Sequence, residues 1–284
     1  MRNNDMAEVR EKPVHPAATV LIVREGTDGL EVYMVRRSAR MAFMPSMHVF
    51  PGGRVDEADG VLAARLVRAG RAGTRLTEGP DTLEDAAAGA VAAIREAAEE
   101  CGLLLACDRT GRVPGHATAR AVFEGLQRGE AFSALLRTYD LMPDLAALHP
   151  FARWVTPDFE ARRYDTRFFL ARAPVGQQAT FDDRETTEGL WVVPSVMLDR
   201  FRAGDVLLAP PTLASLELLA GAGSVEAVLA TIVRPIRPIH PLMVEGEDGQ
   251  PVLALPGDPC YPGEAPPVLP HRTRFRVLGP GRFA

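Results

Sequence analysis

The feature that most constrains the fold is an amphipathic helix predicted from Asp81 to Cys101. Asp81 or Thr82 can cap its start, and Gly102 suits the left-handed position that follows many helices. Apolar residues recur along it at steps of four and three, which places them on one stripe. The stripe consists of Ala87, Val91, Ile94, Ala98 and Cys101. We therefore expect this helix to lie against the core of the domain.

A second face of the same helix carries three carboxylates. Glu96, Glu99 and Glu100 stand in the relation i, i+3 and i+4, so their side chains share the last turns. Like charges at this spacing repel, and nearby arginines or a multivalent cation are needed to hold them together. An exposed, solvated face is the ordinary explanation of such a pattern, because surface helices are often rich in glutamate. The residues around the glutamates decide between a solvated face and a cluster held by arginines or a cation.

The stretch from Arg95 to Leu103 matches the second half of the Nudix box, whose order is Arg, Glu, apolar, any, Glu, Glu, any, Gly, apolar. An accidental match in such a chain is on the order of one in a thousand from ordinary residue frequencies. The chain therefore resembles the Nudix hydrolases. This resemblance implies an α+β fold, a Nudix-type α/β/α sandwich with a mixed sheet, and metal-dependent hydrolysis of a diphosphate bond by water.

The first half of the box lies further back in the chain. It requires a glycine followed six positions later by an acid, which Gly53 and Asp59 supply, with Asp in place of the usual Glu. Counting eight positions back from Arg95 reaches Ala87, so the box is interrupted by 87 minus 59, or 28, residues. An interrupted box is similar to that of the peroxisomal-type acyl-CoA diphosphatases. The similarity extends over residues 17–220 and is carried outside the box by segments 43–53, 153–157 and 163–169.

The resemblance also implies the metal site. Clustered carboxylates are the hard ligands that Mg²⁺ and Mn²⁺ prefer, and such a cation can activate water, so Glu96, Glu99 and Glu100 are assigned to metal binding. By resemblance, Gly53 offers a backbone carbonyl to the same cation. Arg95 either contacts substrate phosphate or supports the glutamate rotamers, and we favour the second role.

Residues outside the box are less strongly indicated. Nudix enzymes often recruit a further carboxylate as base or metal ligand, and Glu185 and Glu188 are the candidates, although a solvated acidic loop explains them equally well. His48 is expected to complete a hydrogen bond from a strand, and Cys101 to pack in the core.

Substrate recognition is expected around residues 36–53. Nudix enzymes that act on coenzyme A often carry Arg-Ser-x3-Arg-x3-Gly-x3-Phe-Pro-Gly-Gly, of which Ala42 and Ser46 replace the central Arg and Gly. Other arginines in this segment can substitute in binding a 3′-phosphate. The predicted substrate-binding residues are Arg37, Ser38, Arg40 and Gly52.

The expected substrate is a nucleoside diphosphate derivative, most readily coenzyme A or acyl-CoA, giving 3′,5′-ADP and (acyl-)phosphopantetheine. A second possibility is ADP-ribose, NADH or a dinucleoside polyphosphate, because the catalytic helix does not select the leaving group. A third, ranked lower because all three glutamates are present, is a nucleotide-sensing Nudix module without activity.

The remaining pattern gives the domain plan: a flexible N-terminus at 1–16, a Nudix domain at 17–233, and a proline-rich extension at 234–284 packed on it. Insertions are expected at 60–80 and 106–150, the second with a helical stretch at 116–140. Strands are expected at 17–23, 30–35, 48–50, 151–155, 166–172 and 190–193, helices near 195–202 and 210–219, and a hairpin at 244–255. The third strand is expected to stop at Pro51-Gly52-Gly53.

Charge and cysteine content narrow the partners. A formal net charge of -5 gives no general attraction to nucleic acid, so an anionic ligand must be held by local arginines or metal. The three cysteines include no Cys-x-x-Cys pair, which argues against structural zinc and fits a reducing, cytoplasmic location. No stretch approaches the roughly 20 apolar residues of a spanning helix, so no membrane partner is expected. A homodimer is left open.

Overall fold

The computed structural model describes residues 12–41, 44–77, 81–182, 184, 186–279 and 282–283. Its centre is a mixed sheet in the order β10-β7-β8-β1-β2-β3, with β4 paired to β1 and β9 paired to β2. The strands of this sheet are β1 (Val14–Gly26), β2 (Gly29–Arg37), β3 (His48–Val49), β4 (Gly52–Arg54), β7 (His149–Val155), β8 (Arg163–Arg172), β9 (Thr186–Val192) and β10 (Pro238–Ile239). Strand β1 runs parallel to β8 and antiparallel to β2 and β4.

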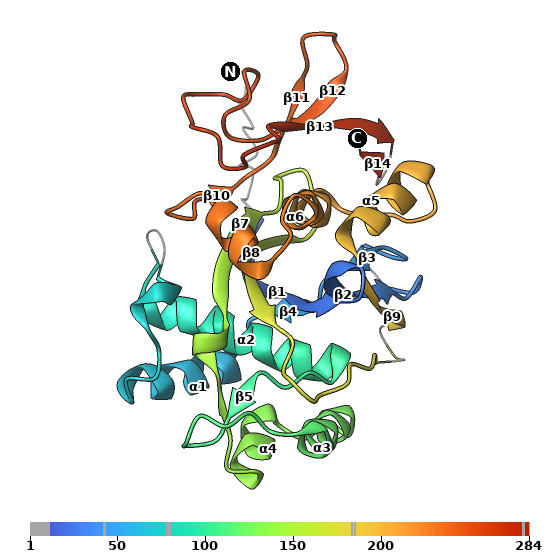
Figure 1. Ribbon diagram of the computed structural model, residues 1–284. Coiled ribbons are helices and arrows are strands. Elements are labelled where there is room, and N and C mark those ends of the chain that lie inside the picture. Colours follow the sequence, from blue (N-terminus) through green and yellow to red (C-terminus); the bar gives the residue numbers. More distant parts are fainter. Residues whose placement is uncertain are drawn as a thin grey trace, which may run out of the picture.

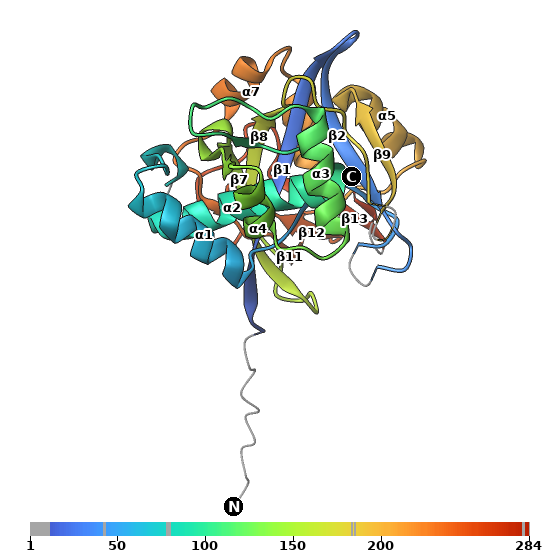
Figure 2. The ribbon, with the colours of Figure 1, turned by 90° about the horizontal axis from the view of Figure 1, so that it is seen from below.

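Helices cover both faces of this sheet. The helices are α1 (Glu57–Arg68), α2 (Leu83–Cys101), α3 (His116–Gln127), α4 (Phe132–Thr138), α5 (Pro194–Ala203), α6 (Pro210–Ala220) and α7 (Val225–Thr231), with short 3-10 turns at Thr74–Leu76 and Leu145–Ala147. Helices α1 to α4 lie on one side and α5 and α6 on the other (Figure 1). Seen from below, α3 and α4 lie in front of the strands (Figure 2). The expected α/β/α sandwich with a mixed sheet is confirmed.

Strand alternation divides the interior into two apolar cores. Ala18, Val20 and Ile22 of β1 pack with α2, whereas Leu21 and Val23 face the core that contains α5 and α6. Successive side chains of a strand point to opposite faces, so one buried strand serves both layers. A single slip of register in β1 would exchange the two sets.

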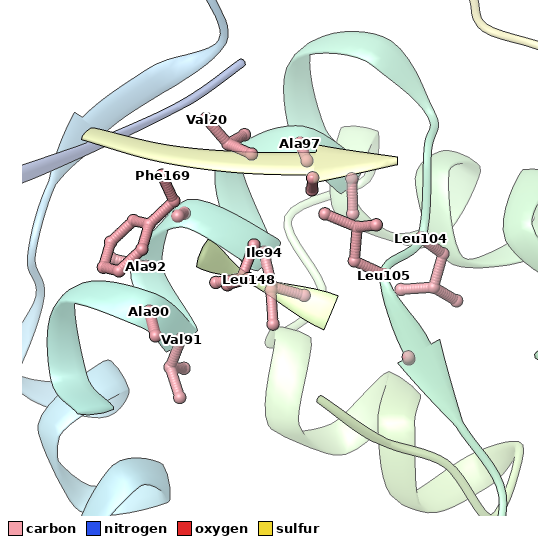
Figure 3. Packing of buried hydrophobic residues seen from close by; sticks show 14 of the residues in the cluster. Val20, Ala90, Val91, Ala92, Ile94, Ala97, Leu104, Leu105, Leu148 and Phe169 are labelled. Carbon is pink, nitrogen blue, oxygen red and sulfur yellow. The ribbon is translucent and has the colours of Figure 1, made fainter. Parts of the chain in front are cut away.

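Helix α2 is the structural centre of the first core. The Thr82 side chain accepts a hydrogen bond from the Asp85 amide at its start, and Gly102 ends it in the left-handed conformation with φ 64°. Every residue of the predicted apolar stripe is buried. Figure 3 shows Val91, Ile94 and Ala97 of this helix among Leu104, Leu148 and other apolar side chains. The predicted helix is thus confirmed to within two residues at its start.

The third strand ends at Val49, before Pro51 as expected, but Gly52 and Gly53, where it was expected to stop, form a new strand. After β3 the chain turns through Phe50 and Pro51 and pairs again as β4, where Gly53 faces Ala18 of β1. The carbonyl of Pro51 accepts a hydrogen bond from the Val20 amide at 2.9 Å. Proline lacks a donor, but its acceptor keeps the segment attached to the sheet.

Two other expectations differ from the structure. The N-terminus was expected to be flexible as far as residue 16; residues 1–11 lie outside the described part, but Val14 already pairs with Arg163 of β8. The segment expected as the first insertion contains most of α1, whose first turn carries the box residue Asp59. The second forms two helices, α3 and α4, because Gly129 turns the chain with φ 84°.

The C-terminal residues form a second layer beyond α6. Besides β10, they make a small sheet of β11 (Leu242–Glu245), β12 (Pro251–Ala254), β13 (Arg274–Gly279) and β14 (Arg282–Phe283). A further pair, β5 (Ala106–Cys107) with β6 (Met142–Pro143), lies beside α4. Leu255 and Phe275 share the second core with Leu213 of α6. Within the described residues no single helix is long and apolar enough to span a membrane, and only the bent pair α6 and α7 meets that test jointly.

Candidate active site

The three glutamates of α2 lie against strand β4. Glu100 is only 7% exposed, and its Oε2 atom accepts a hydrogen bond from the Gly52 amide at 3.1 Å. A Cβ atom at Gly53 would overlap the carboxylate of Glu96, and one at Gly52 would overlap Thr19 and the Ala18 carbonyl. The glycine pair is therefore required for the close approach of β4 to the helix.

Arg95 connects the glutamates to the rest of the site. Its Nη1 atom donates to Glu96 Oε1 and to Glu99 Oε2, both at 2.8 Å. The Nε and Nη2 atoms donate to Asp59 at 3.0 Å each, and Nη2 also donates to the Arg54 carbonyl at 2.9 Å. All three nitrogens of the guanidinium are thus engaged with protein groups, which is the geometry of a residue that orients carboxylates.

Asp59 connects the two halves of the interrupted Nudix box. It lies in the first turn of α1 and is 2% exposed, and its Oδ2 accepts from the Asp56 amide at 2.9 Å as part of a capping box. Its bond to Arg95 joins the first half of the box to the second. Because Asp59 contacts Arg95 directly, the 28 additional residues do not separate the two halves in space.

Burial and crowding change the acidity of this cluster. Burial raises the pKa of Glu96 to about 7, an effect that Arg95 opposes and Glu99 reinforces. Burial also raises the pKa of Glu99 above its usual range. Burial alone would lower the pKa of Arg95, but Asp59 and Glu96 raise it well above its ordinary value. Arg95 therefore stays charged. The raised pKa values of the glutamates mean that this cluster favours binding of a proton or a cation.

The donor set fits a hard divalent cation. Four carboxylates lie within ion-pair distance of Arg95, those of Asp56, Asp59, Glu96 and Glu99, so the cluster carries excess negative charge. All of these donors are oxygens, which Mg²⁺ and Mn²⁺ prefer. Among the described residues, no group of three Asp, Glu, His or Cys side chains is arranged closely enough to hold a metal ion. Glu96 and Glu99 instead point to Arg95.

A pocket of about 790 Å³ opens over the glutamates. Its floor is formed by Gly52, Gly53, Glu96, Glu99 and Glu100, and its walls carry the arginines Arg37, Arg40, Arg54, Arg162 and Arg184. The guanidinium groups of Arg40, Arg162 and Arg184 form no ion pair with any residue that the structure describes. An acidic floor between unpaired arginines is suited to a ligand with several phosphates.

Two predicted substrate-binding or catalytic residues lie elsewhere. Ser38 does not line the pocket, and its Oγ accepts from the Arg40 amide at 3.4 Å. Glu188 pairs with Arg36 across the sheet and faces α5, away from the catalytic helix, with its Oε2 3.6 Å from His48 Nε2. Glu185 lies outside the described residues. The structure therefore does not bring Glu188 to the glutamates of α2.

The expected hydrogen bond of His48 is not present. The side chain is 2% exposed, and neither ring nitrogen has a hydrogen-bond partner within the described structure. Burial lowers the pKa of His48, although Glu188 nearby opposes this. His48 lies on the same face as Glu188 because both pair with Arg36, so it is also remote from the catalytic helix.

Sequence reasoning missed several pocket residues. Asp182 lines the pocket, and its amide donates to the Glu100 carbonyl at 3.2 Å. Gln127 of α3 donates from Nε2 to the Glu99 carbonyl at 3.0 Å. Arg162 and Tyr164 lie near the start of β8. Asp182 lies three residues before Glu185 in the same acidic segment, but nothing in the sequence distinguished it from its neighbours.

Comparison with known proteins agrees with this geometry. A family model described as the NUDT19 Nudix domain matches residues 15–219. The acyl-coenzyme A diphosphatase NUDT19 of Homo sapiens is 30% identical over 274 residues, covering 82% of this chain and 73% of the human protein. That of Gallus gallus is 30% identical over 285 residues, with the same coverage of each chain.

Among solved structures, a Nudix hydrolase from Alicyclobacillus acidocaldarius is 33% identical. It superposes with a TM-score of 0.68 and covers 78% of this chain and 97% of its own. The similarity therefore includes both the fold and the sequence, and the resemblance to Nudix enzymes with an interrupted box is confirmed.

Proposed function

The chain belongs to the NUDT19 Nudix domain family and is a Nudix diphosphatase, and we propose that its substrate is coenzyme A or an acyl-CoA. The reaction is cleavage of the diphosphate by water in the presence of Mg²⁺ or Mn²⁺, giving 3′,5′-ADP and (acyl-)phosphopantetheine. The observation that carries the proposal is the pocket, in which the acidic floor lies between arginines, three of which form no ion pair within the described part of the chain. Two relatives named as acyl-CoA diphosphatases support the choice of substrate.

The charge pattern fits the three phosphates of coenzyme A. A diphosphate over Glu96, Glu99 and Glu100 must be neutralised before water can attack phosphorus, and a cation held by these residues and the Gly53 carbonyl would do this and activate the water. The 3′-phosphate lies away from the reacting bond, so it needs a separate cationic group. Arg40, Arg162 and Arg184 are available for this purpose.

The protein side chains have distinct roles in this proposal. Arg95 holds the carboxylates of Glu96 and Glu99 in place, a role supported by its hydrogen bonds to both. Asp182 is a candidate to accept the proton of the attacking water, since it lines the pocket beside Glu100 and lies outside the box. Glu185 stays a candidate for the same role. The location expected from the sequence, the cytoplasm, belongs to this proposal as well.

A panel of substrates tests the proposal. Purified protein with Mg²⁺ or Mn²⁺ is incubated with acyl-CoA, coenzyme A, ADP-ribose, NADH and a dinucleoside polyphosphate, and the products are separated by chromatography. We expect 3′,5′-ADP to be released from acyl-CoA faster than AMP is released from ADP-ribose. Faster release of AMP would favour the second substrate class, and no turnover of any compound would favour a nucleotide-sensing module.

A further inference from the structure

The pocket has two sides that lie at different strands. Ala17 of β1 pairs with Thr166 of β8 on one side and with Arg54 of β4 on the other. The segment 48–54 in turn lies between β1 and β2, because Val49 pairs with β2 and Gly53 with β1. The start of β8 and the end of β2 are therefore three strand spacings apart, about 14 Å. A ligand that spans the pocket meets different side chains at each end.

We call the first end the β8 side; it consists of Arg162, Tyr164 and Thr166. Arg162 is exposed and unpaired among the described residues, but the turn that carries it is anchored. The next residue, Arg163, is buried and donates from Nε to the Thr156 carbonyl at 3.1 Å. A guanidinium on an anchored turn, beside a half-buried aromatic ring and a hydroxyl, suits a phosphorylated nucleoside, which offers a phosphate and a flat base.

We call the other end the β2 side; it consists of Arg40, Met41 and Met44. Neither methionine belongs to the two apolar cores, although both are partly buried. Met44 and Ser46 have φ angles of 50° and 62°, which non-glycine residues rarely adopt outside functional segments. Methionine side chains are flexible and apolar, so they can pack against alkyl groups of different length. Leu126 of α3 lines the pocket as well.

From these contrasts we infer how the substrate is oriented. The β8 side binds the 3′-phosphoadenosine end, with Arg162 on the 3′-phosphate, and the β2 side binds the pantetheine arm and its acyl chain. The diphosphate then lies between them over Glu96, Glu99 and Glu100. The inference rests on the proposed function, and it moves 3′-phosphate recognition from residues 37–40 to the opposite wall.

Comparison of coenzyme A with 3′-dephospho-coenzyme A tests this orientation. The Arg162→Ala protein should lose the preference for coenzyme A, measured as the ratio of the two kcat/KM values, by on the order of tenfold, the usual effect of one charged hydrogen bond. Arg162→Lys should retain part of it. Arg40→Ala, on the β2 side, should leave this ratio unchanged even where it lowers turnover of both compounds. If Arg40→Ala abolishes the preference and Arg162→Ala does not, the orientation is reversed and the inference fails.

The β2 side has its own test. Met41→Ser with Met44→Ser should lower kcat/KM for a long-chain acyl-CoA relative to free coenzyme A and leave the preference for the 3′-phosphate intact. Arg120→Ala, an exposed α3 residue paired with Glu124 outside the pocket, is the control for surface substitution. Loss of the 3′-phosphate preference in the methionine variant would contradict the assignment of the two sides.

A binding measurement separates this inference from the proposed function. Calorimetry with 3′,5′-ADP and with AMP reports the 3′-phosphate contact without turnover, and Arg162→Ala should bring the two dissociation constants together. Wild-type protein that cleaves ADP-ribose and not coenzyme A would overturn the proposed function and the subsite with it. The other outcome would overturn the subsite alone. In that case the wild-type protein cleaves coenzyme A, but the Arg162→Ala protein still binds 3′,5′-ADP and AMP with different affinities.

Discussion

The carboxylate of Asp59 accepts two hydrogen bonds from Arg95, one from Nε and one from Nη2, across 36 residues of sequence. Each of these side chains lies on a different helix, and the pair is largely excluded from solvent. A bidentate pair of this kind fixes the plane of the guanidinium. The orientation of Glu96 and Glu99 therefore depends on a residue that makes no direct contact with them in the described structure.

The first prediction concerns this pair. Asp59→Asn removes the carboxylate that accepts from both Nε and Nη2 of the buried guanidinium, and breaking a buried pair by removing one partner costs about 3 kcal/mol. We expect urea unfolding to show a decrease of that order, together with a lower kcat. Asp59→Glu, which restores the carboxylate usual in the box, should recover part of both.

The control for this prediction is an exposed pair. Asp140→Asn removes the partner of Arg109 on the surface, where such pairs contribute less than about 1 kcal/mol. Equal loss of stability in Asp59→Asn and Asp140→Asn would contradict the structural importance given to Asp59.

The second prediction concerns the metal ligands. Glu99→Gln and Glu100→Gln each remove a charged oxygen donor, and loss even of outer partners of a metal site costs roughly 10- to 100-fold. We expect kcat to fall by at least about 100-fold and the Mg²⁺ concentration for half-maximal activity to rise. Removal of divalent cations with a chelator should abolish turnover. Glu84→Gln, exposed in the first turn of the same helix, is the matched control and should leave turnover unchanged.

The third prediction tests the close approach of β4 to α2. Gly53→Ala places a methyl group where the Glu96 carboxylate lies, so it should displace that side chain and lower kcat without changing the fold. Gly60→Ala in α1 meets no atom within contact distance and should raise the free energy of unfolding by about 0.5–1 kcal/mol. Full activity in Gly53→Ala would exclude a role for this approach.

Local patterns account for what was predictable from the sequence. Helix α2 has its caps, its stripe and its three glutamates within 22 residues, and propensity, capping and periodicity all indicate the same element. The position of Glu188 could not be predicted in this way. Its face depends on the register of β9 against β2, which shifts between Arg36 and Arg37, and a shift of one residue reverses every side chain.

Long-range pairing explains the other omissions. Arg162 and Tyr164 reach the pocket because β8 runs parallel to β1, a contact between segments about 150 residues apart that no local pattern encodes. Asp59 was identified only through the resemblance, because an acid six positions after Gly53 has significance only when it is compared with the Nudix box. The partner that fixes it, Arg95, became apparent from the hydrogen bonds.

The fourth prediction distinguishes two acidic residues of one chain segment. Asp182 lines the pocket beside Glu100, whereas Glu188 faces α5. Asp182→Asn should lower kcat by roughly 100-fold, the typical contribution of a general base, with little change in the stability of the protein. Glu188→Gln should leave kcat within about twofold of wild type. The opposite ranking of the two variants would indicate that the catalytic base comes from the other side of the sheet.

The last prediction concerns pH and the metal-free protein. Burial raises the pKa of Glu96 from 4.5 to about 7, so the folded protein binds a proton at this site more tightly than the unfolded chain does. The contribution of this group to stability is complete below pH 4.5 and is lost as the pH rises through 7. Urea unfolding in chelator should therefore show a free energy of unfolding that falls across this interval, and Glu96→Gln should flatten the dependence. A cation that neutralises the cluster should flatten it as well, because it removes the reason for Glu96 to hold a proton. An identical slope in wild-type and Glu96→Gln protein would show that another group is responsible.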